Sequence, residues 1–239
     1  TLRGEDGLDG NVKNFVMPGL KKKLKLGIAK EYFNSSLDKE VEKMIMDVKK
    51  TYEKIGIEVV ELSLPHTKYM VPVYYIIMPA EVSSNLGRFD GIRYGNDRNS
   101  FGEEAKRRIM LGSYVLSAGY YDAYYEKAMK VRTKIIEDYD NAFNPSADGV
   151  DGIISPVSPT PAFKIGENSN DPLKMYLEDV YTTSANMAGI PSLALPSTFS
   201  KSGLPIGFQI MGPRFSEHKL FELGRRYHKE IDYKPKVAI

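Results

Sequence analysis

The chain has 239 residues and a mass of 26.9 kDa, with 42% hydrophobic and 27% charged residues and a formal net charge of +2. This balance is typical of one large globular domain or two small ones, and it argues against a disordered tail, a collagen-like rod or a coiled coil. The absence of cysteine excludes disulfides, thiolate zinc sites, iron–sulfur clusters and a cysteine nucleophile. The near-neutral charge offers no global field for nucleic acid, and no apolar run reaches the roughly 20 residues that cross a bilayer.

The first third of the chain predicts a linker followed by a βαβ unit. Residues 1–20 carry Gly, Asp and Pro without periodicity, and the first residue is not Met, so we expect an approach segment of a longer protein. Alternating apolar residues predict a strand at 24–29, helical spacing predicts a helix at 37–55, and IEVVELSLP (57–65) predicts a buried strand. Such a unit favours parallel pairing of its strands.

The middle of the chain is mostly helical by pattern. We expect one helix after Lys68, another near 102–117 and a longer one across 119–142. A short buried strand follows in GVDGIISP (149–156), and the proline-rich SPVSPTPAF must be irregular.

The last third predicts one more helix, a hairpin and a final amphipathic helix. A helix is expected from about 172 to 188, ending at Gly189. SLALPSTF and LPIGFQIMG, joined by a Ser-Lys-Ser-Gly turn, indicate a hairpin. Ser216 should start the final helix, with Leu220, Phe221 and Tyr227 facing inward. The whole pattern predicts an α/β fold in which helices cover a mixed β-sheet.

The residues alone show no self-contained catalytic constellation. The histidines are His66, His218 and His228, and no two of them have the spacing that places two imidazoles on one helical face. We therefore expect no metal site. The phosphate-binding motifs and the G-x-S-x-G nucleophile elbow are also missing.

Two segments suggest ligand binding. In EEAKRRIM, the cations Lys106, Arg107 and Arg108 point in different directions around a helix, so at least one should face inward. An inward arginine presents a planar fork that suits a carboxylate, whereas the alternative is a solvated basic face. Asp179 lies in a helix that should be largely buried, where its carboxylate needs either a structural donor or a ligand cation.

Four long motifs carry a family resemblance. They are LPHTKYMVPVYYIIMPAEVSSNLGRFDGIRYG (64–95), FGEEAKRRIMLGSYVLSAGYYDAYYEKAMKVR (101–132), SPTPAFKIGE with DPLKMYLEDVYTTSANMAGIPS (158–192), and GLPIGFQIMGPRF (203–215). In these motifs the chain resembles the C-terminal half of the A subunits of glutamyl-tRNA(Gln)/aspartyl-tRNA(Asn) amidotransferases, which are amidase-signature enzymes. The resemblance implies that residues 21–239 form the C-terminal part of a single amidase-signature domain.

The resemblance also implies a function. Such A subunits hydrolyse glutamine and pass the ammonia to a B subunit, which amidates mischarged tRNA with ATP and magnesium. It further implies a cytoplasmic heterotrimer with B and C subunits, in which tRNA is bound mainly by the B subunit. No cofactor, metal or membrane would be bound by this chain. The Ser–Ser–Lys machinery of the family belongs to its N-terminal half, so the resemblance assigns no catalytic residue here and makes that half a required partner.

What the resemblance does assign is one wall of the glutamine pocket. Tyr74, Arg108 and Asp179 fall at positions that hold glutamine in similar enzymes. Arg108 would bind the α-carboxylate, Asp179 the α-ammonium, and Tyr74 would add a hydroxyl contact.

Two alternatives remain open at this stage. The chain could be a non-catalytic module that binds an amino acid or docks a partner. It could also belong to an enzyme that acts on another small amide, although YYIIMPAE and KRRIMLG argue against that.

Overall fold

We describe a computed structural model of the chain, which covers residues 23–34, 36–89, 91, 93–167, 172–231 and 233. The linker expected over residues 1–20 lies outside the described residues. The chain divides into two compact units: unit 1 comes from Thr1–Leu64 and Tyr139–Ile239, and unit 2 from Pro65–Asp138. Each unit has its own architecture.

Unit 1 is built on a five-stranded sheet in the order β2-β1-β3-β5-β4. The strands are β1 (Lys25–Ala29), β2 (Glu58–Leu62), β3 (Gly152–Pro156), β4 (Ser192–Phe199) and β5 (Pro205–Met211). β1 pairs in parallel with β2 and β3, whereas β5 pairs antiparallel with β3 and β4. The predicted mixed sheet, with its βαβ unit and its hairpin, is confirmed.

Helix α1 (Lys39–Lys54) joins β1 to β2 and is delimited by residues suited to helix ends. The Asp38 carboxylate accepts a hydrogen bond from the Glu40 amide at 2.7 Å, which satisfies one of the N–H groups that the first turn leaves unpaired. Gly56 follows the helix at a φ of 81°, in the left-handed region that favours glycine. The chain can therefore leave the helix and re-enter the sheet as β2.

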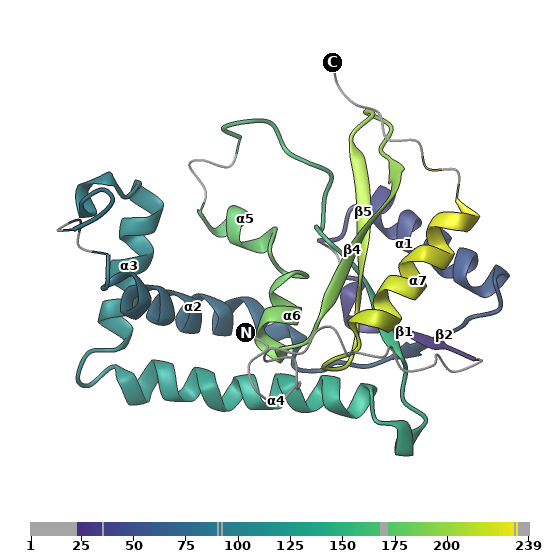
Figure 1. The fold of residues 1–239 in the computed structure, drawn as a ribbon, viewed down its shortest axis with the longest axis horizontal. Helices are drawn as coiled ribbons and strands as arrows, with labels where there is room; N and C mark the ends of the chain where they lie inside the picture. Colours follow the sequence, from purple (N-terminus) through teal and green to yellow (C-terminus); the bar gives the residue numbers. More distant parts are fainter. Residues whose placement is uncertain are drawn as a thin grey trace. The chain divides into compact units, whose positions relative to one another are not determined.

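Helices α1 and α7 (Glu217–Glu230) contact each other and the strands, so both cover the same face of the sheet (Figure 1). The Tyr52 hydroxyl of α1 donates a hydrogen bond to the carbonyl oxygen of Leu223 in α7 at 3.2 Å. The rings of Tyr52, Phe208 and Tyr227 pack together on this face. Because neighbouring residues of a strand point to opposite faces, Gln209 of β5 points to the other face.

Two expectations about burial are wrong. The second strand is expected to be buried, but β2 is an edge strand, and its Glu58 and Glu61 are exposed. Charged side chains are common on edge strands, which have a neighbour on one side only. Phe221 is expected to face inward, but it is 61% exposed, and Leu223 takes the buried position of that turn.

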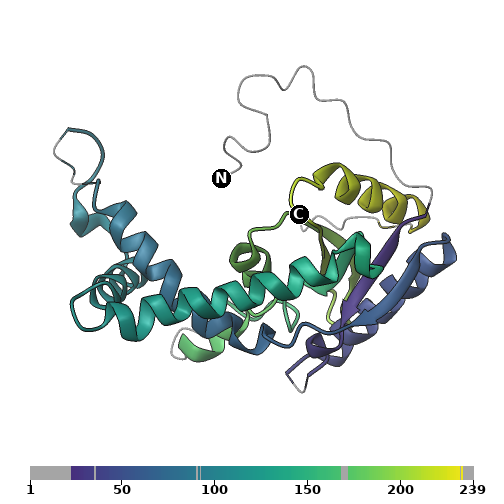
Figure 2. The same ribbon diagram turned by 90° about the horizontal axis from the view of Figure 1, so that it is seen from below.

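Unit 2 is helical, as predicted. It contains α2 (Met70–Leu86), α3 (Glu103–Val115), a π-helical turn (Tyr121–Glu126) and most of α4 (Lys127–Ala142), which begins directly after that turn. Helices α2 and α3 pack against each other, and both views show them as adjacent blue helices (Figures 1 and 2). No helix in the described residues is long and apolar enough to cross a bilayer.

Gly112 marks the closest approach of α3 to α2. A Cβ atom built at this position would lie 1.8 Å from the carbonyl oxygen of Pro79, so the backbone would have to move. Gly112→Ala is expected to destabilise unit 2 by about 1–3 kcal/mol, the usual cost of overpacking. Urea unfolding followed by circular dichroism measures this, and Ser113→Ala, at an exposed position of the same helix, is the matched control. Equal unfolding midpoints for the two variants would contradict the close approach.

Candidate functional site

Helix α3 carries the three consecutive cations that the sequence singles out. The exposed fractions of their side chains are 42% for Lys106, 57% for Arg107 and 29% for Arg108. The expectation that one of the three turns inward is therefore confirmed, and Arg108 is the residue that does so.

The Arg108 guanidinium is held by a hydrogen bond at Nε and by a nearby aromatic ring. Its Nε donates a hydrogen bond to Glu104 Oε1 at 2.8 Å, and its Cζ lies 5.5 Å from the centre of the Tyr75 ring. Its Nη1 lies 4.0 Å from the sulfur of Met78. Burial lowers the pKa of Arg108, but the hydrogen bond to Glu104 and the neighbouring Tyr75 and Tyr74 outweigh it and leave the pKa above its ordinary value. Arg108 is thus a permanently charged group with a defined orientation.

Tyr74 and Tyr75 come from α2, which packs against α3 within unit 2. Their rings lie 5.1 Å apart, nearly perpendicular to each other. Tyr75 provides the ring beneath the guanidinium, and Tyr74 is close enough to raise the pKa of Arg108. The structure therefore brings two of the three predicted site residues, Tyr74 and Arg108, to one part of unit 2. Their role in binding glutamine stays a prediction.

Asp179, the third predicted residue, lies in unit 1, in a turn rather than in a helix. The single helix expected from 172 to 188 is wrong, because α5 (Pro172–Leu177) and α6 (Thr183–Ala188) are separated by the turn 178–182. The Tyr181 carbonyl accepts a hydrogen bond from the Gln209 side chain at 3.0 Å, and the Asp179 carbonyl accepts one from Thr183 Oγ1 at 3.0 Å. The Asp179 carbonyl also accepts from the Thr183 amide at 3.1 Å, so α6 begins directly after this turn. Gly189 ends α6 as expected, at a φ of 66°.

The turn that carries Asp179 is tied to the rest of unit 1. Glu178 accepts hydrogen bonds from Ser158 Oγ at 2.9 Å and from Thr160 Oγ1 at 3.2 Å, which fixes the turn to the proline-rich loop. Tyr181 is buried, and its hydroxyl donates to the carbonyl oxygen of Tyr32 at 2.9 Å. Burial also raises the pKa of Tyr181 to about 12, which keeps this donor protonated. Asp179 itself is half-buried, as the sequence predicts.

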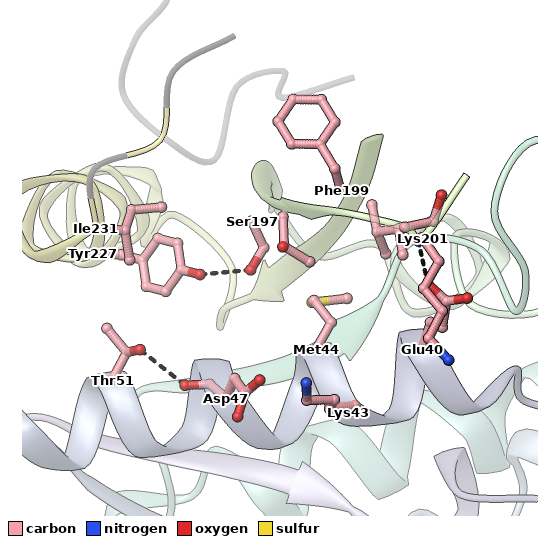
Figure 3. Close-up of a pocket in the computed structure, with 13 residues that line it drawn as sticks. Glu40, Lys43, Met44, Asp47, Thr51, Ser197, Phe199, Lys201, Tyr227 and Ile231 are labelled. Carbon is pink, nitrogen blue, oxygen red and sulfur yellow. Dashed lines mark hydrogen bonds between the residues drawn. The ribbon is translucent and has the colours of Figure 1, made fainter. Parts of the chain in front are cut away.

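A separate groove of about 380 Å³ lies on unit 1 between α1, α7 and the end of the hairpin. It contains none of the three predicted site residues. Several polar groups of its lining bond to each other: Tyr227 and Ser197 share a hydrogen bond of 2.7 Å, and Glu40 accepts one from the Lys201 amide at 2.7 Å (Figure 3). This pairing gives the groove no convergent group that points to a particular ligand.

The hydrogen bonds of the serines and the grouping of acidic and histidine side chains bear on the chemistry of the described residues. None of their serine hydroxyls forms a hydrogen bond with a lysine or histidine side chain; Ser158 bonds to Glu178, and Ser197 to Tyr227. Nor does this part of the chain gather three His, Asp or Glu side chains that could hold a metal ion. Taken separately, the Arg108 guanidinium of unit 2 is chemically suited to a carboxylate, and the Asp179 carboxylate of unit 1 is suited to a cation.

Sequence reasoning missed the residues that support this site. Glu104 and Tyr75 orient Arg108, and Glu178 anchors the turn of Asp179. The spacing of four between Glu104 and Arg108 was a usable signal, because such residues are neighbours on a helix surface. No comparable local signal links Glu178 to Ser158, which lies 20 residues away.

A mixed five-stranded sheet covered by helices defines an α/β fold. The sequence matches the family described as Amidase over residues 12–221, so the chain belongs to the amidase family.

The relatives of this chain with high sequence identity are A subunits of glutamyl-tRNA(Gln) amidotransferases. The chain is 50% identical over 230 residues to the A subunit of the glutamyl-tRNA(Gln) amidotransferase of Desulfatibacillum aliphaticivorans, and the match covers 90% of this chain and 47% of that protein. The corresponding A subunit of Myxococcus xanthus is 49% identical over 225 residues, with coverage of 88% and 46%. The chain therefore spans about half the length of the curated relatives that it matches. This confirms the resemblance to part of an amidotransferase A subunit.

Two solved structures have a fold similar to that of this chain. The crystal structure of the glutamyl-tRNA(Gln) amidotransferase A subunit from Thermotoga maritima is 40% identical, with a TM-score of 0.70 over 89% of this chain and 43% of that one. The Kluyveromyces lactis allophanate hydrolase is 22% identical, with a TM-score of 0.67 over 87% of this chain and 32% of that one. The second likeness shows the fold alone. The predicted amidase-signature fold is confirmed.

Proposed function

We propose that this chain is part of the glutamine-hydrolysing component of a tRNA-dependent amidotransferase, in which it supplies the wall that holds the amino-acid end of glutamine. The similarity to amidotransferase A subunits supports the enzyme class. The observation that carries the proposal is the Arg108 guanidinium, which is partly buried and lies at cation–π distance from the Tyr75 ring. Within the described residues, its hydrogen bond to a carboxylate lies along its Nε edge, at Glu104.

The chemistry of glutamine explains why such a wall is needed. Free glutamine has a carboxylate and an ammonium at Cα, both of which must be kept apart from the side-chain amide that is attacked. In our proposal Arg108 binds the carboxylate, Asp179 binds the ammonium, and Tyr74 donates or accepts one further hydrogen bond. The nucleophile and base come from the half of the protein that precedes this segment in the family.

The rest of the proposed reaction lies outside this chain. The released ammonia passes to a B subunit, which uses ATP and magnesium to amidate Glu-tRNA(Gln) or Asp-tRNA(Asn). The complex includes a C subunit, works in the cytoplasm and binds tRNA mainly through the B subunit. The chain itself binds no cofactor in this proposal.

Substrate analogues that each lack one charge test the proposal in the full-length protein in complex with its partners. Glutamine α-amide lacks the carboxylate, and glutaramate lacks the α-ammonium. We expect each to be hydrolysed with a kcat/KM lower by about 30-fold or more, because each leaves one charged side chain unpaired. Ammonia release measured with the three compounds decides this. Equal kcat/KM values for glutamine and either analogue would refute the corresponding contact.

A further inference from the structure

We infer that Glu104 is a positioning residue that orients Arg108 to bind a carboxylate through its two terminal nitrogens. This inference rests on the proposed function, because it takes Arg108 as the group that binds the α-carboxylate of glutamine. Glu104 touches neither the substrate nor the reacting atoms in this proposal, and it acts only through Arg108.

The geometry of the hydrogen bonds supports this role. Glu104 Oε1 accepts from Arg108 Nε at 2.8 Å, and its Oε2 accepts from Arg107 Nη1. A guanidinium has two edges that can pair with a carboxylate, one with Nε and one with both terminal nitrogens. Glu104 engages the first edge. Within the described part of the chain, Arg108 Nη2 has no hydrogen-bond partner, and Nη1 has the 4.0 Å contact with the Met78 sulfur. Neither terminal nitrogen is paired with an oxygen there, so the second edge is the one available to a carboxylate.

The Tyr75 ring completes the orientation. Its centre lies 5.5 Å from Arg108 Cζ, a cation–π distance, while the hydrogen bond to Glu104 holds the Nε edge. A guanidinium held by both interactions has less freedom than an unpaired one. Ligand binding then loses less side-chain entropy than it would with a free arginine.

The charges of Glu104, Arg107 and Arg108 also suit the binding of an anion. Glu104 lies between Arg107 and Arg108, and the hydrogen bond from Arg108 lowers the pKa of its carboxyl, so the carboxylate stays ionised. Two guanidinium groups around one carboxylate leave a net positive charge, and the site can therefore still attract an anion. The Arg107–Glu104 pair is exposed and therefore adds little to stability.

Kinetics of the full-length protein with its partners test the inference. We expect Glu104→Ala to raise the KM for glutamine about tenfold with little change in kcat, because a small misplacement of a positioned group can cost up to about a hundredfold. Glu104→Gln, which keeps an acceptor for Nε, should fall between the wild type and Glu104→Ala. Glu103→Ala is the matched control, since Glu103 lies next to Glu104 and its side chain is 88% exposed.

A second substrate separates positioning from damage to the fold. Glutamine α-amide has no carboxylate for Arg108 to bind, so Glu104→Ala should leave its kcat/KM unchanged. Equal losses with glutamine and glutamine α-amide, or a KM like that of Glu103→Ala, would overturn the positioning role.

The Arg108→Ala variant shows whether a negative result refutes the positioning role of Glu104 alone or the proposed function as well. If Arg108→Ala has no effect with glutamine, the proposed carboxylate contact itself is wrong. If Arg108→Ala is impaired, adding Glu104→Ala to it should cause no further loss, because Glu104 acts only through Arg108. An additive loss in the double variant would contradict the inference.

Discussion

Replacing Arg108 or Asp179 by alanine in the full-length protein is expected to lower kcat/KM for glutamine by about 30-fold or more. Truncating one partner of a charge-assisted contact in a sheltered pocket costs about 2–5 kcal/mol, and that loss appears directly in the transition-state free energy. Arg108 is 29% exposed and already oriented by Glu104, so its loss removes a preformed group rather than a mobile surface cation. Steady-state ammonia release from glutamine measures the effect.

Two controls keep this prediction specific. Amidation of tRNA with ammonia supplied directly should be largely spared, because ammonia enters after the glutamine pocket in the proposed reaction. Arg107→Ala removes a neighbouring arginine whose side chain is 57% exposed, and it should leave glutamine hydrolysis nearly unchanged. Equal losses with glutamine and ammonia would indicate general destabilisation, and no loss with glutamine would refute the assignment.

Regular elements with strong local signals could be predicted from the sequence. The βαβ unit was predictable because its strands alternate, its helix follows Asp38, and Gly56 provides the left-handed residue after the helix. The hairpin was predictable because two apolar strands flank a turn in which Gly203 adopts a φ of 83°. In each case the information lies within a few neighbouring residues.

The predicted secondary structure was wrong where contacts with residues distant in the sequence accompany a change in the backbone. The helix expected at 172–188 is interrupted at 178–182, where distant residues hold the turn: Gln209, on a strand, donates to the Tyr181 carbonyl, and Ser158 donates to Glu178. No window of sequence around the turn contains these partners. For α7 the error was one of phase: Leu220, Leu223 and Tyr227 are buried at intervals that follow the helical period, and Phe221 lies off that stripe.

In the candidate site, too, some features follow from local sequence and others depend on residues far apart in the chain. That one of the three cations of α3 turns inward follows from helical geometry, but choosing Arg108 came from the family resemblance. The packing of α2 on α3, which places Tyr75 under the guanidinium, depends on the close contact of Gly112 with Pro79. Such tertiary contacts join residues that are 33 positions apart in the sequence, so local patterns carry no trace of them.

The largest effect is expected for the 239-residue chain on its own, which should release no ammonia from glutamine. In our proposal amide hydrolysis needs an activated serine from the preceding half of the protein, and the positioning groups proposed here, Arg108 and Asp179, cannot replace it. In the described residues the serines near the predicted site bond to acceptors instead: Ser158 donates to Glu178, and Ser155 donates to the carbonyl oxygen of Pro156. Ammonia release by the purified chain, compared with the full-length protein, checks this. Turnover above a buffer blank that persists through a second purification would show that a nucleophile lies within these residues.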